Sequence, residues 1–200
     1  FMYFVLIQVL GMGVMFSYIA SSPFVFQEHY HLSPVMYSVC FACNAVAIML
    51  GSLRVVRFRS NEHALRVGVW GFMFLCCCTG ASLCMELSVI IIEIVFFLFL
   101  FFLGIILPTS TTLALNLERQ NSGTASALFG AAGFAFGGIV SPLVGLGDIL
   151  STTGLIFFIC SVCSLCFSVL AMNQTHTNLW GSFRSKMGPV ARFVFLKREK

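Results

Sequence analysis

Six long apolar stretches, separated by short polar connections, constrain the fold of this chain more than any other feature. Each has about 20 residues, enough to cross a hydrocarbon core of about 30 Å at the rise of an α-helix. Only 9% of the 200 residues are charged and 59% are hydrophobic, so a soluble fold would leave a large apolar surface exposed. We therefore predict an all-α membrane protein, a bundle of six transmembrane helices. The stretches cover residues 1–27, 34–53, 66–85, 88–115, 121–147 and 150–172.

The eleven Lys and Arg residues follow the second, fourth and sixth stretches, and the other connections carry acids and histidines. Lys and Arg beside a span resist translocation, so basic connections mark the cytoplasmic side. We predict two cytoplasmic ends, a six-helix domain over residues 1–172 and a basic cytoplasmic tail over 173–200. Nucleic-acid binding is disfavoured, because no basic stripe exists outside these loops. The basic residues are Arg54, Arg57, Arg59, Arg66, Arg119, Arg184, Lys186, Arg192, Lys197, Arg198 and Lys200; the acids and histidines are Glu28, His29, His31, Glu86 and Asp148.

The six stretches divide into two sets of three, residues 1–85 and 88–172. Because three is odd, the second set crosses the membrane in the opposite sense to the first, which is the geometry of an inverted repeat in secondary transporters. The opening helix of each set carries a proline beside small hydroxyl residues, at Pro23 and at Pro108. A proline removes one helical hydrogen bond, and nearby hydroxyls can satisfy the freed carbonyl. Such helices line substrate paths in many transporters, although an ordinary kinked helix gives the same pattern.

Polar side chains within the predicted spans are candidates for lining a substrate cavity, because they are costly when they face lipid. The first helix carries a polar stripe that suits moderately apolar solutes. Asn44 is the one amide of the second helix, where burial demands a partner. Hydrogen bonding between helices without any ligand explains the same pattern. The candidates are Gln8, Tyr18, Ser21, Ser22, Pro23, Gln27, Asn44 and Thr109.

The fifth stretch is rich in small residues at helical spacing. Small residues four apart let two helix backbones approach closely, so dispersion contacts can drive association within lipid. We expect tight helix packing here rather than chemistry. The packing residues are Gly130, Gly133, Gly137, Ser141 and Gly145.

Glu93 is the one acid well inside an apolar run, about five residues, or roughly 8 Å, from its outer end. Acids within a span are functional candidates by default, and this one is a candidate for proton coupling. At this depth the side chain could instead lean outward to the lipid headgroups.

No pattern in the sequence indicates an enzyme, a metal site or a cofactor. His29 and His31 with Glu28 could hold a metal loosely, but such a group is common by chance. The nine cysteines include two CxxC spacings, at Cys40 and at Cys160, which in a soluble protein suggest redox chemistry or zinc. On a membrane helix, cysteine serves more simply as a small packing residue.

Several segments together resemble the second half of Bcr/CflA-type drug-resistance transporters of the major facilitator superfamily. The resemblance covers most of residues 10–146, and its most specific element is the SYIxxSPF pattern that begins at Ser17. The matching segments are Phe16–Gln27, Tyr30–Pro34, Phe41–Ala45, Leu50–Ser52, Leu107–Thr109, Ala114–Leu115 and Ser122–Leu128.

This resemblance implies one six-helix half of a major facilitator fold, with its amino-terminal six-helix half missing. The chain also begins at Phe1 within an apolar run and without a charged leader, so we expect a fragment or a truncated gene product. The family implies proton-coupled efflux of small amphipathic drugs across the inner membrane of a bacterium. It places the first, second, fourth and fifth helices around the central cavity. A metabolite exporter of the same superfamily, or a non-functional transporter remnant, remains an alternative.

Overall fold

The prediction of six membrane-spanning helices is confirmed. The structure, a computed structural model, describes the backbone of residues 1–186 and the side chains of residues 1–174. Within that part of the chain, six helical segments are long and apolar enough to cross a membrane, and no strand occurs. The long helices are α1 (Met2–Pro23), α2 (Pro34–Arg54), α3 (Asn61–Cys84), α4 (Val89–Leu117), α5 (Ser122–Leu143) and α6 (Ile149–Lys186). Four short helical segments accompany them: the π-helical η1 (Phe24–His29) and the 3-10 turns η2 (Val55–Arg57), η3 (Arg119–Asn121) and η4 (Val144–Leu146).

Two helix starts are set by serine caps. The Ser33 hydroxyl accepts a hydrogen bond from the Met36 amide at 3.3 Å, and Pro34 occupies the first turn of α2, where its missing N–H costs nothing. The Ser60 hydroxyl accepts from the His63 amide at 3.2 Å. Helix α3 therefore begins directly after Ser60 and not at residue 66, where the apolar run begins.

The last helix continues well past its apolar run. α6 extends to Lys186, whereas the apolar residues end near 172. No proline interrupts residues 173–186, so nothing in the backbone ends the helix where hydrophobicity ends. The predicted basic tail falls partly on this helix and, from residue 187 onward, outside the described residues.

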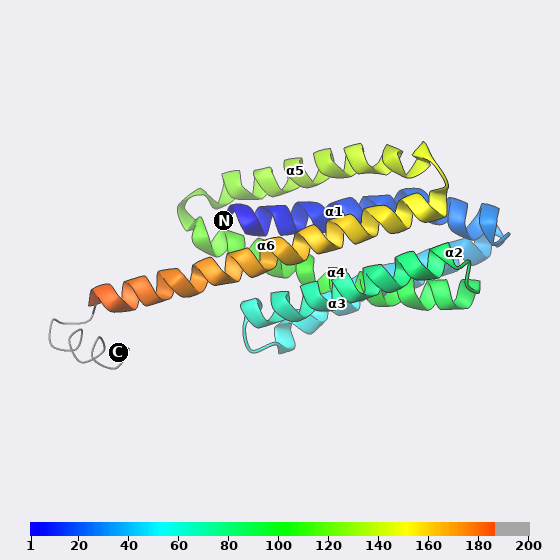
Figure 1. Cartoon of the computed structure of the whole chain (residues 1–200). Helices are drawn as coiled ribbons and strands as arrows, with labels where there is room; N and C mark the ends of the chain where they lie inside the picture. The colour runs from blue at the N-terminus through cyan, green and yellow to red at the C-terminus, as the bar shows by residue number, and fades with distance from the viewer. Residues whose placement is uncertain (187–200) are drawn as a thin grey trace.

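Helices α1 and α4 form the centre of the bundle (Figure 1). α1 packs chiefly against α4, α5 and α6, and α4 packs chiefly against α1, α2 and α3; α3 also packs against α6. Exchanging the first three helices with the last three reproduces this set of principal contacts. Two inverted three-helix repeats would give this arrangement, in which the second helix of each set lies on the opening helix of the other.

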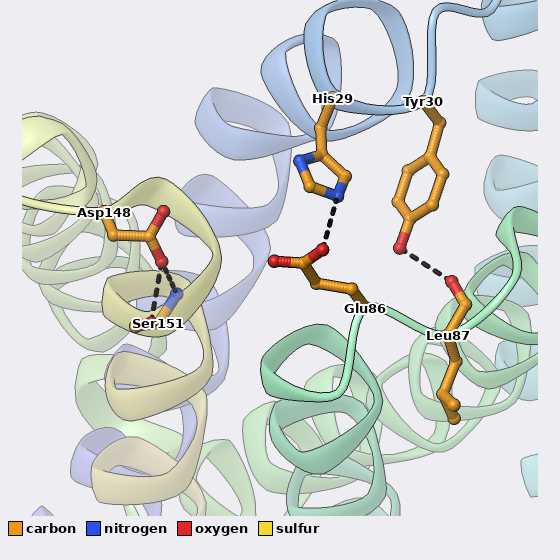
Figure 2. A network of polar contacts seen from close by, with 6 residues as sticks. All are labelled: His29, Tyr30, Glu86, Leu87, Asp148 and Ser151. Atoms are coloured by element: carbon orange, nitrogen blue, oxygen red, sulfur yellow. Dashed lines mark hydrogen bonds and ion pairs between the residues drawn. The ribbon is translucent and has the colours of Figure 1, made fainter.

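The connections segregate by charge to opposite ends of the bundle (Figure 1). At one end, the Tyr30 phenol donates to the Leu87 carbonyl at 2.7 Å, and His29 Nε2 lies 3.9 Å from Glu86 Oε2. Asp148, on the connection between η4 and α6, lies at the same end (Figure 2). The basic α2–α3 and α4–α5 connections lie at the other end with Phe1. We call these the acidic end and the basic end.

Helices α2 and α4 approach each other closely at two glycines. A Cβ atom on Gly51 would meet the carbonyl oxygen of Phe101, and a Cβ atom on Gly104 would meet that of Ile48. At this crossing the Ser52 hydroxyl donates to the Gly104 carbonyl at 3.0 Å. In a regular α-helix the Gly104 carbonyl would accept a hydrogen bond from the amide of residue 108, and Pro108 has no N–H group to donate. A hydroxyl of the neighbouring helix, and not one beside the proline, therefore satisfies this carbonyl.

The predicted packing residues of α5 fall into two groups. Gly133 receives the side chain of Met12, and Gly137 receives that of Phe16, both from α1. Ser141 is partly buried. Gly130 and Gly145 have no atom within 4 Å of where a Cβ would lie. Close packing at these last two glycines therefore stays a prediction.

Candidate functional site

A hydrogen-bonded group of three side chains joins three helices in the half of the bundle nearer the acidic end. Asn44 of α2 donates from its side-chain nitrogen, Nδ2, to the phenol oxygen of Tyr18 on α1 at 3.0 Å. The same nitrogen donates to Oε2 of Glu93 on α4 at 3.1 Å. We call Tyr18, Asn44 and Glu93 the polar triad. Sequence reasoning named all three residues but assigned them separate roles.

The triad is buried and incompletely satisfied. Asn44 is 1% exposed and Tyr18 is 3% exposed, while Glu93 is partly buried. Asn44 Oδ1 and Glu93 Oε1 are both shielded from solvent and have no hydrogen-bond partner. A buried polar atom without a partner is costly, so each such atom calls for an explanation in terms of function or of an absent partner.

Glu93 does not lean outward, as its distance from the end of α4 allowed. Its carboxylate turns into the bundle and meets Asn44, the eleventh of the 21 residues of α2. The side chain is thus held at the depth of the middle of a neighbouring span. Inward orientation toward protein is the typical behaviour of ionisable groups within membranes.

Aromatic rings surround Tyr18 and make its side of the triad apolar. The Tyr18 ring stacks on Phe41 with ring centres 5.9 Å apart, and meets Phe96 and Phe99 edge-on at 5.3 Å and 6.1 Å. Phe96 and Phe99 are fully buried, whereas Phe41 on α2 is exposed. The Tyr18 ring is therefore enclosed on the side of α4 and bordered by an exposed ring on the side of α2, a helix of which only Asn44, Ala47 and Gly51 are buried.

The remaining candidates near Tyr18 make contacts between and within helices. The Ser22 hydroxyl lies 3.1 Å from the Tyr37 phenol oxygen, which links the end of α1 to α2. Ser21 is buried, and its hydroxyl donates to the Tyr18 carbonyl at 3.4 Å. Pro23 ends α1, and the backbone continues as the π-helical η1, which carries Gln27. The predicted interruption of the helix at Pro23 is therefore a change of helix type.

Gln8 makes a separate polar contact between α1 and α4, nearer the basic end, and Thr109 precedes its partners on α4. The Gln8 side-chain oxygen accepts from the hydroxyls of Thr111 and Ser110, the latter at 3.4 Å. Thr109 is buried, and its hydroxyl donates to the Ile105 carbonyl of its own helix. Gln8 and Tyr18 are ten residues apart on α1, about 15 Å along the helix. The candidates thus form two groups and not one continuous stripe.

Four partners were not singled out by the sequence. They hydrogen bond to another helix and are Tyr37, Ser52, Ser110 and Thr111. Hydroxyl groups are common within these spans, so residue type alone did not distinguish these four. The short Leu50–Ser52 segment was noted for its resemblance to a transporter family, but nothing in the sequence linked it to Gly104.

The acidic end holds a shallow cavity of about 360 Å³. Glu28, His29 and Asp148 line it together with apolar residues. Hydrogen bonds from the Ser151 hydroxyl and amide, at 2.7 and 2.9 Å, hold the pKa of Asp148 below its usual range (Figure 2). Partial burial raises the pKa of the Tyr30 phenol, and nearby Glu86 adds to the shift. The Tyr30 and His29 contacts join the α1–α2 connection to the α3–α4 connection, whereas the Asp148 bonds are local to the start of α6.

The described residues hold no group of three or more His, Cys, Asp or Glu side chains that could bind a metal ion. All nine cysteines are free thiols, and the CxxC pairs lie within helices α2 and α6. What the triad can do chemically is narrower: it can hold a carboxyl group that gains and loses a proton, with an amide and a phenol as neighbours.

One bacterial protein is similar in sequence to most of this chain. Over 176 residues, which are 83% of the chain, 34% of positions are identical to the uncharacterized MFS-type transporter YdgK of Bacillus subtilis (strain 168). The chain spans 42% of the length of that relative. No family model matches the chain, and no solved structure matches it. The similarity supports membership of the major facilitator superfamily, whose initials the relative's name carries.

Proposed function

We propose that this chain is the carboxyl-terminal six-helix half of a major facilitator exporter of the Bcr/CflA type, which couples proton entry to the efflux of small amphipathic compounds. The observation that carries the proposal is the polar triad. Its carboxyl group lies inside a membrane-spanning bundle, has a single hydrogen-bond donor among the described residues, and keeps one oxygen unpartnered.

A proton is the ligand that this geometry fits. Protonation of Glu93 would remove the charge from an apolar, aromatic surrounding, which is where charge is most costly. Binding a proton needs no room, and on the α4 side the rings of Phe96 and Phe99 already pack against Tyr18 of the triad. A carboxyl group that alternates between the two protonation states would thus change the bond between α4 and α2 at each transport cycle.

Substrate would bind between this half and the missing amino-terminal half. The outer face of α2, with few buried residues, is suited to lining such a cavity. Alternating access would rock the two halves about a site near the middle of the membrane. We expect the isolated 200 residues neither to bind nor to move substrate efficiently, because one wall of the cavity is absent.

Charge favours neutral or cationic substrates over anionic ones. In the described residues, Lys and Arg occur only on α2, α3, the carboxyl-terminal part of α6 and the connections of the basic end. This half therefore offers no positive counter-charge to an anionic substrate in the middle of the membrane. A metabolite exporter that carries acids is accordingly the weaker alternative.

The test is efflux of a fluorescent amphipathic dye from bacterial cells that make the full-length protein from the gene containing this chain. We expect efflux that depends on the proton gradient and on external pH. Glu93→Gln, which keeps shape and removes titration, should abolish the pH dependence. Glu86→Gln, at an exposed position of the acidic end, is the matched control and should leave it unchanged. Efflux with the wild-type pH profile in Glu93→Gln would rule out Glu93 as the coupling residue.

A further inference from the structure

We propose that Asn44 is the positioning residue of the proton site: its amide holds the Glu93 carboxylate inside the bundle and thereby sets the pH range in which Glu93 binds a proton. This inference rests on the proposed function, because it assigns a partner to the proton-binding group. Nothing in the resemblance or in the comparisons assigns such a role to the second helix of this half.

The amide is used to its full donor capacity. A side-chain amide has two N–H groups, and both face oxygen atoms, at 3.0 Å from the Tyr18 phenol and 3.1 Å from the Glu93 carboxylate. Tyr18 is packed between Phe41, Phe96 and Phe99, so it is a fixed acceptor. It holds one N–H group and so directs the other toward Glu93.

The carboxylate depends on this one donor. Among the described residues, Glu93 Oε2 has Asn44 as its hydrogen-bond partner, and Oε1 has none. A hydrogen bond donated to a carboxylate favours its charged form. Removing the Asn44 amide would leave the carboxylate without a described donor in an apolar surrounding. The neutral acid would then remain the favoured form up to a higher pH.

The neighbouring titratable groups do not supply an alternative. Tyr18 on α1 and Cys40 on α2 are the titratable side chains that interact with Glu93 from the elements packed around it. Phenols and thiols are ordinarily neutral at acidic and neutral pH. Tyr37 of α2 interacts with Tyr18. Within the described part of the chain no cation pairs with Glu93, and the ion pair of His29 with Glu86 lies apart from it at the acidic end. The amide is therefore the group that decides the balance.

The α2–α4 contact offers a matched control. Ser52 and Asn44 both donate side-chain hydrogen bonds from α2 to α4, but Ser52 bonds the Gly104 carbonyl, 11 residues along α4 from Glu93. Ser52→Ala removes a bond between the same two helices without touching the triad. It separates a loosened helix contact from a direct effect on the carboxyl group.

The experiment is an infrared pH titration of the full 200-residue chain, purified in lipid nanodiscs, that follows the carbonyl band of a protonated carboxyl group. The band should be present in the wild type and absent in Glu93→Gln. Asn44→Leu should raise the pH at half-protonation by about one unit or more, because a hydrogen bond to a charged group is lost. Tyr18→Phe should raise the pH at half-protonation by less, because this change removes the bond that orients the Asn44 amide but keeps the amide itself. Ser52→Ala should leave it in place.

The outcomes separate the two proposals. A band that Glu93→Gln removes, with the same midpoint in Asn44→Leu as in the wild type, would overturn the role of Asn44 and leave the proton site standing. If Glu93→Gln removes no titrating band, both the role of Asn44 and the proton site are overturned. If Asn44→Leu does not fold, Tyr18→Phe decides: an upward shift supports the inference, and an unchanged midpoint overturns it.

Discussion

Adding one methyl group at Gly51 should destabilise the bundle, because α2 and α4 touch there through their backbones. The new Cβ atom would meet the Phe101 carbonyl oxygen, which is a backbone atom and cannot rotate away. The two helices would have to separate. The same separation would lengthen the hydrogen bond from Ser52 to the Gly104 carbonyl, now 3.0 Å, and that carbonyl has no helical donor because Pro108 lacks an N–H group.

The magnitude follows from these two effects. Overpacking a close contact costs about 1–3 kcal/mol, and losing the hydrogen bond costs about 1 kcal/mol more. Replacing glycine by alanine in a helix also stabilises the helix by up to about 1 kcal/mol, because alanine has the higher helix propensity. Gly138→Ala on α5 is the matched control, because a Cβ atom at Gly138 meets nothing within 4 Å. The propensity gain cancels between the two variants, so Gly51→Ala should be less stable than Gly138→Ala by about 2–4 kcal/mol.

The assay is reversible unfolding of the purified chain in mixed detergent micelles, followed by circular dichroism as the denaturing detergent is increased. The free energy of unfolding of Gly51→Ala should fall well below that of Gly138→Ala. Equal stability of the two variants would refute the close backbone contact between α2 and α4. Gly104→Ala, whose Cβ would meet the Ile48 carbonyl oxygen, should behave like Gly51→Ala.

Two further predictions concern the acidic end. Asp148→Ala should lower the free energy of unfolding by about 1 kcal/mol at neutral pH, because Asp148 caps the start of α6. Hydrogen bonds lower the pKa of Asp148, so its contribution to stability is present above the ordinary Asp range and is lost as the pH falls through the lowered folded-state pKa. The free energies of unfolding of wild type and variant should therefore converge in acid. A constant difference in free energy down to the lowest pH would contradict this. Tyr30→Phe removes the 2.7 Å bond to the Leu87 carbonyl and should cost about 1 kcal/mol, with faster amide exchange in the α3–α4 connection. Unchanged exchange there would show that the bond does not hold the connection.

The spans could be predicted because a bilayer imposes a length on apolar residues. That rule correctly located all six helices, and the alternation of basic and acidic connections matches the two ends of the bundle. It could not locate helix ends, which depend on local backbone chemistry. Ser60 starts α3 before the apolar run, and α6 continues after its apolar run into a segment without proline.

The members of the polar triad could be predicted, but their pairing could not. Tyr18, Asn44 and Glu93 are conspicuous as polar groups within apolar runs. Whether they meet depends on the rotation and tilt of three helices, which hydrophobicity leaves undetermined because these spans are apolar on nearly all sides. The Gly51–Gly104 contact was missed for a similar reason: one glycine on each of two helices makes no repeating pattern, whereas the glycines of α5 do.

If Glu93 carries the proton that drives transport, proton flux through the transporter should depend on its carboxyl group. Full-length transporter in sealed vesicles with an internal pH dye would be exposed to a substrate gradient with no initial pH difference. We expect substrate-driven proton movement in the wild type and in Glu86→Gln, and none in Glu93→Gln. Proton movement of wild-type size in Glu93→Gln would contradict this expectation.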